Sequence, residues 1–157
     1  MGRRLARELA FRTLFQSERG AEPLLEVWHS VRAELAETGQ DDEDDAYGEA
    51  LDAEAIAFAD GLLRFYDAHR TEVDGVLEEA ISGWTFGQMS QTDLNVLRLA
   101  VTEMRYVDGP PQVPIEMAVR LAKKFGGDES GRFVNGVLAK VLRAAPRPLA
   151  EEGSGVR

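Results

Sequence analysis

Three arginines at the start of the chain could bind a phosphate backbone. Arg3, Arg4 and Arg7 fall within about 100° of arc on a helical wheel, so a helix would present them as one cationic ridge. A guanidinium pairs bidentately with phosphate oxygens, and its flat face stacks on unpaired bases. A solvated helix face is the alternative, because three arginines at a helix start cost only roughly a few tenths of a kcal/mol against the helix dipole.

A second group of candidate binding residues surrounds a glycine turn and consists of Lys123, Lys124, Gly127, Ser130, Arg132 and Phe133. Glycines let backbone N–H groups approach a ligand, and a helix start at Ser130 would add its positive dipole end, so both features favour a phosphate. An unpaired base could stack on Phe133. An ordinary helix stop explains the glycines equally well, and Val134 and Val137 favour a core position for Phe133.

The basic residues are segregated along a chain whose formal net charge is -10. Residues 120–147 carry seven Lys or Arg against two acids, whereas residues 21–119 carry five Arg against twenty-two acids. An acidic chain repels most nucleic acid, so any RNA contact must be confined to the local basic patches.

Composition limits the classes of protein to which this chain can belong. A length of 157 residues with 44% hydrophobic side chains suits one compact domain. The absence of cysteine fits a reducing, cytoplasmic compartment. The N-terminus has no apolar stretch long enough for a signal peptide, and no run approaches a membrane span. We therefore expect no membrane association.

The sequence offers little support for catalysis. His29 and His69, the only histidines, have no spacing that would place two imidazoles on one metal ion. Serine nucleophile elbows, phosphate-binding loops and dinucleotide fingerprints are missing. A calcium loop from Asp41 would need glycine at its sixth position, where Ala46 stands. We expect no enzyme, no cofactor and no metal.

Apolar periodicity predicts an all-α fold of about seven helices. The expected helices and caps place Thr71, Ser90 and Ser130 at helix starts, Phe65 and Trp84 on inward-facing stripes, and Gly126 at a left-handed helix end. Residues 1–146 are expected to form a single domain with an acidic loop at 37–54, which holds nine acids, and residues 147–157 a disordered tail.

Four segments together resemble the NusB family of bacterial transcription antitermination factors: RRLARELAFRTLF from Arg3, DLNVLRLAVTEM from Asp93, VPIEMAVRLAKKFG from Val113 and ESGRFVNGVLAKVL from Glu129. The resemblance covers nearly the whole expected fold. It implies two packed helical bundles, binding of boxA-type single-stranded RNA, and a heterodimer with ribosomal protein NusE within the transcription elongation complex that makes rRNA.

The resemblance also assigns residues. It places the family's arginine-rich motif on Arg3, Arg4 and Arg7, and its RNA-contacting loop and helix start on residues 127–133. Asp93 falls on the family's partner-contacting position, although an N-cap role explains Asp93 equally well. The chain departs from the family pattern at two places. Glu116-Met117 follow Ile115 where many members have Asn-Glu, and the acidic insert at residues 37–54 is unusual.

Two other interpretations remain open. The same helical domain resembles an N-terminal RNA-binding module of rRNA cytosine methyltransferases. We expect no catalytic domain here, because 157 residues leave no room for one and a glycine-rich cofactor loop is missing. A homodimer could instead pair apolar helix faces and cover the basic surface, so that RNA binding would require dissociation.

Overall fold

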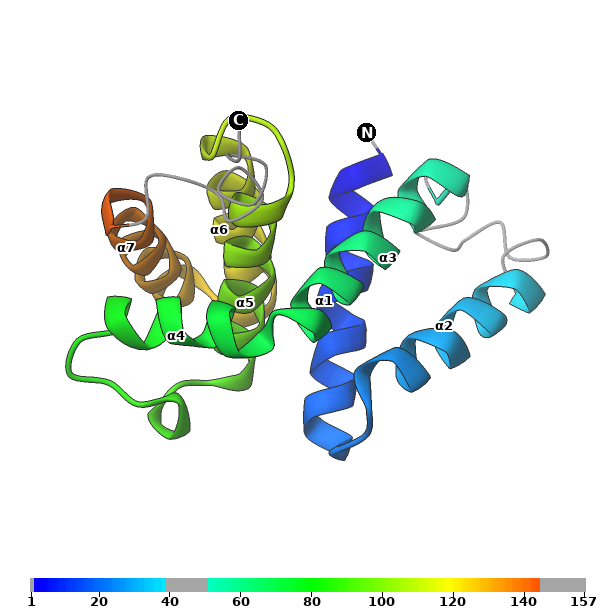
Figure 1. The fold of residues 1–157 in the computed structure, drawn as a ribbon, viewed down its shortest axis with the longest axis horizontal. Helices are drawn as coiled ribbons and strands as arrows, with labels where there is room; N and C mark the ends of the chain where they lie inside the picture. The colour runs from blue at the N-terminus through cyan, green and yellow to red at the C-terminus, as the bar shows by residue number, and fades with distance from the viewer. Residues whose placement is uncertain (1, 39–50, 145–157) are drawn as a thin grey trace, which may run out of the picture. The chain divides into compact units, whose positions relative to one another are not determined.

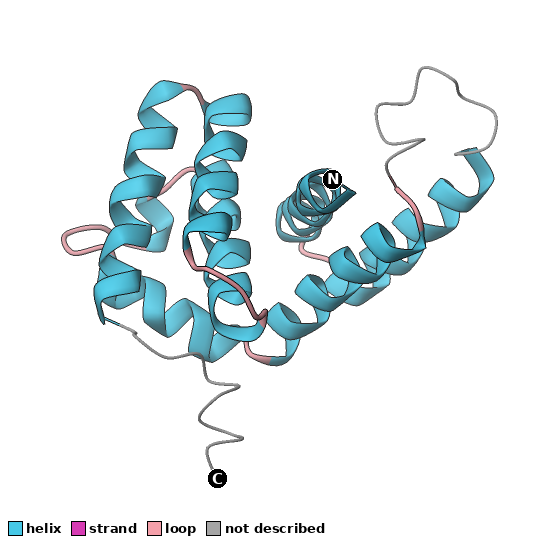
Figure 2. Cartoon of the chain, turned by 90° about the horizontal axis from the view of Figure 1, so that it is seen from above, coloured by secondary structure: helices cyan, strands magenta, loops and turns pink. Residues whose placement is uncertain are grey.

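The computed structural model describes residues 2–38 and 51–144. These residues form seven α-helices and one short 3₁₀ helix, with no strand among them (Figures 1 and 2), which confirms the predicted all-α fold. The chain divides into two compact units, Met1–Asp67 and Ala68–Arg157. Residues 39–50 of the expected acidic loop, and the tail at 147–157, lie outside the described residues, whereas both ends of that loop, Glu37 and Glu54, belong to helices.

The first unit contains α1 (Gly2–Gly20), α2 (Leu24–Thr38) and α3 (Ala53–Ala68). Helices α1 and α2 pack against each other. Each carries a stripe of apolar residues at helical spacing, and packing buries the two stripes together. All three helices contribute to the buried core, which includes Leu9, Phe11, Leu14, Leu24, Val27, Trp28, Leu62, Leu63 and Tyr66.

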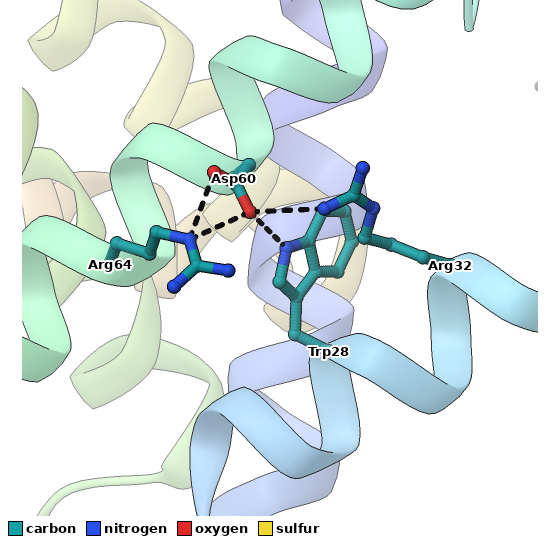
Figure 3. Close-up of polar contacts among 4 residues, drawn as sticks. All are labelled: Trp28, Arg32, Asp60 and Arg64. Atoms are coloured by element: carbon teal, nitrogen blue, oxygen red, sulfur yellow. Dashed lines mark hydrogen bonds and ion pairs between the residues drawn. The ribbon is translucent and has the colours of Figure 1, made fainter.

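A polar cluster joins α2 to α3 at the edge of this core. The indole Nε1–H of Trp28 donates a hydrogen bond of 2.8 Å to Oδ1 of Asp60, and the Trp28 side chain is only 1% exposed. Arg64 donates through Nε to both carboxylate oxygens at 3.0 Å, and Arg32 donates to Oδ1 at 3.4 Å (Figure 3). One carboxylate therefore accepts from three side chains on two helices.

Replacing Asp60 with Ala is expected to lower the free energy of unfolding by about 2 kcal/mol, because the buried indole N–H would lose its acceptor. Urea unfolding followed by circular dichroism measures this change. The control is Arg64→Ala, which removes an exposed ion pair between residues four apart and should cost about 0.5 kcal/mol or less. Equal losses in the two variants would show that the indole bond is not the stabilising contact.

The second unit contains α4 (Arg70–Ala80), the 3₁₀ helix η1 (Phe86–Gln88), α5 (Gln91–Tyr106), α6 (Gln112–Gly126) and α7 (Asp128–Ala144). Helix α5 contacts α4, α6 and α7, and α6 lies beside α7 (Figure 1). Every residue of α5 from Leu94 to Glu103 is buried. The sequence predicted only one apolar stripe on this helix, whereas the structure makes it the central helix of the unit.

Burial of α5 extends to a charged side chain. Arg98 is 8% exposed and forms a bidentate ion pair with Asp74 of α4, with Nε–Oδ1 and Nη2–Oδ2 distances of 3.1 and 3.2 Å. Its Nη1 also donates to Oδ1 of Asn95 at 3.2 Å. This set of bonds compensates the removal of the guanidinium from water.

Several local predictions were wrong. Thr71 does not cap α4, which begins at Arg70 after His69 without a side-chain cap. Phe65 is 39% exposed and Trp84 is 52% exposed. Trp84 misses the inward stripe because α4 ends at Ala80, so the helical phase that would have turned Trp84 inward is lost. The Ser90 cap is confirmed, since its Oγ accepts a hydrogen bond of 3.1 Å from the Asp93 N–H.

Candidate nucleic-acid interface

The arginine ridge forms at the start of α1. Arg3 and Arg4 are exposed and Arg7 is half-buried, while Ala6 and Leu9 on the other side of the helix are buried. The first turn of α1 holds no acidic residue. The packing of α1 therefore leaves the ridge accessible, as its helical spacing predicted.

Phe58 of α3 provides a support for the ridge that the sequence did not reveal. The guanidinium carbons of Arg3 and Arg7 lie 4.5 and 5.1 Å from the centre of its ring. A cation–π contact holds the flat face of a guanidinium but leaves the N–H groups at its edge able to donate to phosphate. Phe58 thus restricts two of the three arginines before any ligand arrives.

The second candidate cluster lies where α6 meets α7. Gly127 ends α6 with φ 92° and ψ -177°, and its N–H donates to the Lys123 carbonyl at 3.0 Å. The sequence predicted Gly126 as the residue with positive φ, but the structure has Gly127 in that conformation. Gly126 is needed for another reason, because a Cβ at this position would collide with the side chain of Ser130. Helix α7 begins at Asp128, so Ser130 lies within its first turn and does not cap it.

The start of α7 is less favourable for an anion than the sequence suggested. Its first turn carries Asp128 and Glu129, and both side chains are exposed. Two carboxylates offset the positive end of the helix dipole. Attraction for a phosphate must therefore come from the neighbouring cationic side chains.

Those cations are arranged on both helices of the turn. Lys123, Lys124 and Arg132 are exposed. The stem of Lys123 crosses to α7, where a Cβ at Gly131 would lie 2.6 Å from Lys123 Cγ, so a larger residue at position 131 would displace the Lys123 side chain. The Lys124 ammonium lies 5.4 Å from the centre of the Phe125 ring.

Phe133 is half-buried. Its exposure is therefore intermediate between that of a core residue and that of a ring free to stack on an unpaired base. Its ring centre lies 5.6 Å from that of Trp84, and the two rings meet at 60°. Trp84 was assigned to the core from the sequence, so, like Phe58 beside the arginine ridge, it is a candidate residue that the sequence did not reveal. The dipeptide Ser82-Gly83, which ends the helical pattern, was the available signal.

Asp93 lies in the first turn of α5 and is half-buried. Its N–H is bound to Ser90, but its Oδ1 is buried and makes no hydrogen bond to any described residue. The adjacent Thr92 methyl group lies 3.6 Å from the position of a Cβ on Gly126. The start of α5 therefore adjoins the α6–α7 turn, which makes the candidate partner residue a neighbour of the second cationic cluster.

The candidate residues divide between the two units. Arg3, Arg4 and Arg7 belong to the first, whereas Asp93 and the residues from Lys123 to Phe133 belong to the second. Across both sets of described residues, no three His, Asp or Glu side chains are placed to hold a metal ion. No helix formed by residues 2–38 or 51–144 has the length and apolarity to cross a membrane.

Replacing Gly127 with Ala is expected to cost about 1–2 kcal/mol of stability, because its positive φ strains any side chain. Gly136 is the matched control within α7, since a Cβ there meets nothing within 4 Å. Gly136→Ala should raise stability by about 0.5–1 kcal/mol. Thermal unfolding distinguishes the two, and a stabilised Gly127→Ala variant would contradict the assignment of the turn.

Comparison with known proteins identifies relatives over almost the whole chain. A transcription antitermination protein NusB of Thermus thermophilus is 50% identical over 141 residues, which are 90% of each chain. A structure of T. maritima NusB superposes with a TM-score of 0.73 at 30% identity and covers 90% of both chains. A structure of antitermination factors NusB and NusE in complex with double-stranded RNA gives a TM-score of 0.74 at 26% identity, over 91% of this chain and 97% of that one.

The sequence profile of the NusB family matches residues 4–143. This range includes Arg4, Arg7, Asp93 and the entire α6–α7 turn, so the predicted family resemblance is confirmed over both units. The chain belongs to the NusB family.

Proposed function

We propose that this protein is a non-enzymatic transcription antitermination adaptor that binds boxA-type single-stranded RNA together with ribosomal protein NusE in the elongation complex. The observation that carries the proposal is the family match over residues 4–143. Relatives named as antitermination proteins and a structural neighbour containing NusE and RNA support it.

RNA is proposed to contact both cationic clusters. Arg3, Arg4 and Arg7 would pair with phosphates through guanidinium edges, with Arg3 and Arg7 held against Phe58. Lys123, Lys124 and Arg132 would neutralise further phosphates at the α6–α7 turn. The exposed carboxylates of α7 make this second contact depend on side-chain cations, so binding should weaken steeply with salt.

NusE is proposed to contact the start of α5 through Asp93. The Asp93 side chain is half-buried, and its carboxylate could accept from a cationic or N–H donor of a basic ribosomal protein. Because Thr92 adjoins Gly126, a partner bound at the start of α5 would lie next to the RNA proposed to bind at the α6–α7 turn. Recruitment of RNA and of NusE would then support each other.

Fluorescence anisotropy with labelled RNA tests the RNA-binding part of the proposal. A boxA-type single strand should bind more tightly than a scrambled strand of equal length and composition. A duplex of the same sequence is the third ligand, because the neighbouring complex contains double-stranded RNA. Equal affinity for all three would reduce the binding to general electrostatic attraction and contradict the proposal.

Size-exclusion chromatography tests the homodimer alternative. The adaptor should elute as one 1:1 species with RNA, and Arg132→Ala should weaken that species without changing the size of the free protein. A dimer that dissociates when RNA is added would show that apolar pairing covers the basic surface and limits binding.

A further inference from the structure

We infer that Trp84 and Phe133 together form a stacking subsite for one unpaired nucleobase, a conclusion that rests on the proposed RNA-binding function. Phe133 alone follows from the family resemblance. Trp84 enters from the structure, since the sequence placed it in the core. The subsite lies entirely within the second unit, between the loop after α4 and the first turns of α7.

Trp84 is exposed although the segment around it is fixed in place. Ile81 and Met89, on either side, are 3% and 8% exposed. Phe86 lies over the buried Arg98, whose guanidinium carbon is 5.5 Å from the ring centre. Trp84 nevertheless remains 52% exposed. Because its neighbours are buried, this exposure does not come from a loosely attached loop.

Backbone bonds also set the position of the indole. The Trp84 N–H donates to the Ile81 carbonyl at 2.8 Å, and Gly83 has φ 85°, a conformation that favours glycine. On the far side, the Thr85 N–H donates to Oε1 of Gln88 at 2.9 Å. These bonds fix the backbone from which the indole projects, and the indole contacts Phe133, so a stacking ligand has less conformational freedom to restrict.

The relation between the two rings suits a base. Their 60° contact differs from a parallel stack, which would hide one face of each ring. Arg132 precedes Phe133 and is exposed, so a cation for the phosphate accompanies the aromatic surface. Aromatic rings next to cationic side chains are the combination that binds single-stranded nucleic acid with little sequence preference.

A protein segment is the rival occupant, because an exposed tryptophan also suits a protein interface. The base is favoured by the contact with Phe133 and by the lysines and arginine of the α6–α7 turn. The two occupants differ in what they require: a protein contact at Trp84 would not depend on any individual base of the RNA.

Intrinsic tryptophan fluorescence gives a direct test, with a boxA-type single-stranded RNA oligonucleotide as the probe. The chain has two tryptophans, and Trp28 is buried at 1% exposure, so quenching by a stacked base should come from Trp84. We expect RNA to quench the wild type, and the quenching to disappear in Trp84→Phe while RNA still binds. RNA binding without quenching of Trp84 would overturn the subsite and leave the proposed function intact.

Affinity measurements on variants complete the test. Trp84→Ala should weaken RNA binding about tenfold, and Trp84→Phe should restore most of that loss. Val113→Ala, which shortens another exposed apolar side chain, on α6, should leave the affinity unchanged. An unchanged affinity in Trp84→Ala would overturn the inference.

Oligonucleotides with a single abasic nucleotide locate the stacked base. One abasic position should weaken wild-type binding about tenfold and have little further effect on Trp84→Ala, because both changes remove the same contact. Additive losses at every position would overturn the subsite. If Trp84→Ala impairs NusE binding without affecting RNA, Trp84 is a protein contact. Absence of any RNA binding by the wild type would overturn the proposed function together with the subsite.

Discussion

The double variant Arg4→Ala, Arg7→Ala is expected to bind boxA-type RNA about 30-fold more weakly than the wild type, if each lost exposed ion contact contributes about 1 kcal/mol. If about four of the six proposed cationic side chains pair with phosphates at one time, log K should fall against log salt with a slope near -3. Removing two contacts should reduce that slope to about -1.4. Anisotropy titrations between about 50 and about 200 mM salt measure both quantities.

A matched variant separates the ridge from the charge of the whole chain. Arg12 and Arg19 lie on the same helix and are exposed, so Arg12→Ala, Arg19→Ala changes the net charge equally. This control should leave the salt slope close to that of the wild type. Equal effects of the two double variants, or unchanged RNA affinity after loss of Arg4 and Arg7, would remove the ridge from the proposed interface.

Asp74→Ala is expected to cause the largest loss of stability, about 3 kcal/mol, because it leaves the buried Arg98 guanidinium without its carboxylate. The loss should be visible as a lower urea midpoint with an unchanged slope of the transition. Glu116→Ala breaks the exposed pair with Arg120 and should cost less than about 0.5 kcal/mol.

The reason for the large effect can be checked separately. If an unpaired buried charge causes the loss, replacing both partners by apolar residues, as in Asp74→Leu, Arg98→Met, should recover much of the stability. A double variant as unstable as the single one would instead indicate that packing around α4 and α5 depends on the side chains themselves.

The helices could be predicted because their apolar residues recur at helical spacing and their ends carry recognisable caps. Ser90 shows this most clearly, since its predicted cap bond to the Asp93 N–H is present. The central position of α5 could not be predicted in the same way. Arg98 and Glu103 would mark a solvent-facing side by residue type, and only the packing of α4 against α5 reveals that Asp74 compensates the buried arginine.

The candidate interface was predicted in part. Local spacing identified the arginine ridge, but its contact with Phe58 joins residues far apart in the chain, and no sequence pattern selects one aromatic partner among many. Between two adjacent glycines, the sequence could not decide that Gly127 rather than Gly126 takes the positive φ. Trp84 was misplaced because helical periodicity was continued past Ala80, where α4 ends.

The proposed adaptor role predicts that NusE and RNA bind cooperatively to this chain. The most direct test is the dissociation constant for boxA-type RNA, measured at fixed salt with and without saturating NusE. Saturating NusE should tighten RNA binding at least about tenfold, a coupling of about 1.4 kcal/mol, and Asp93→Ala should reduce that gain. An RNA affinity that NusE leaves unchanged would contradict the account.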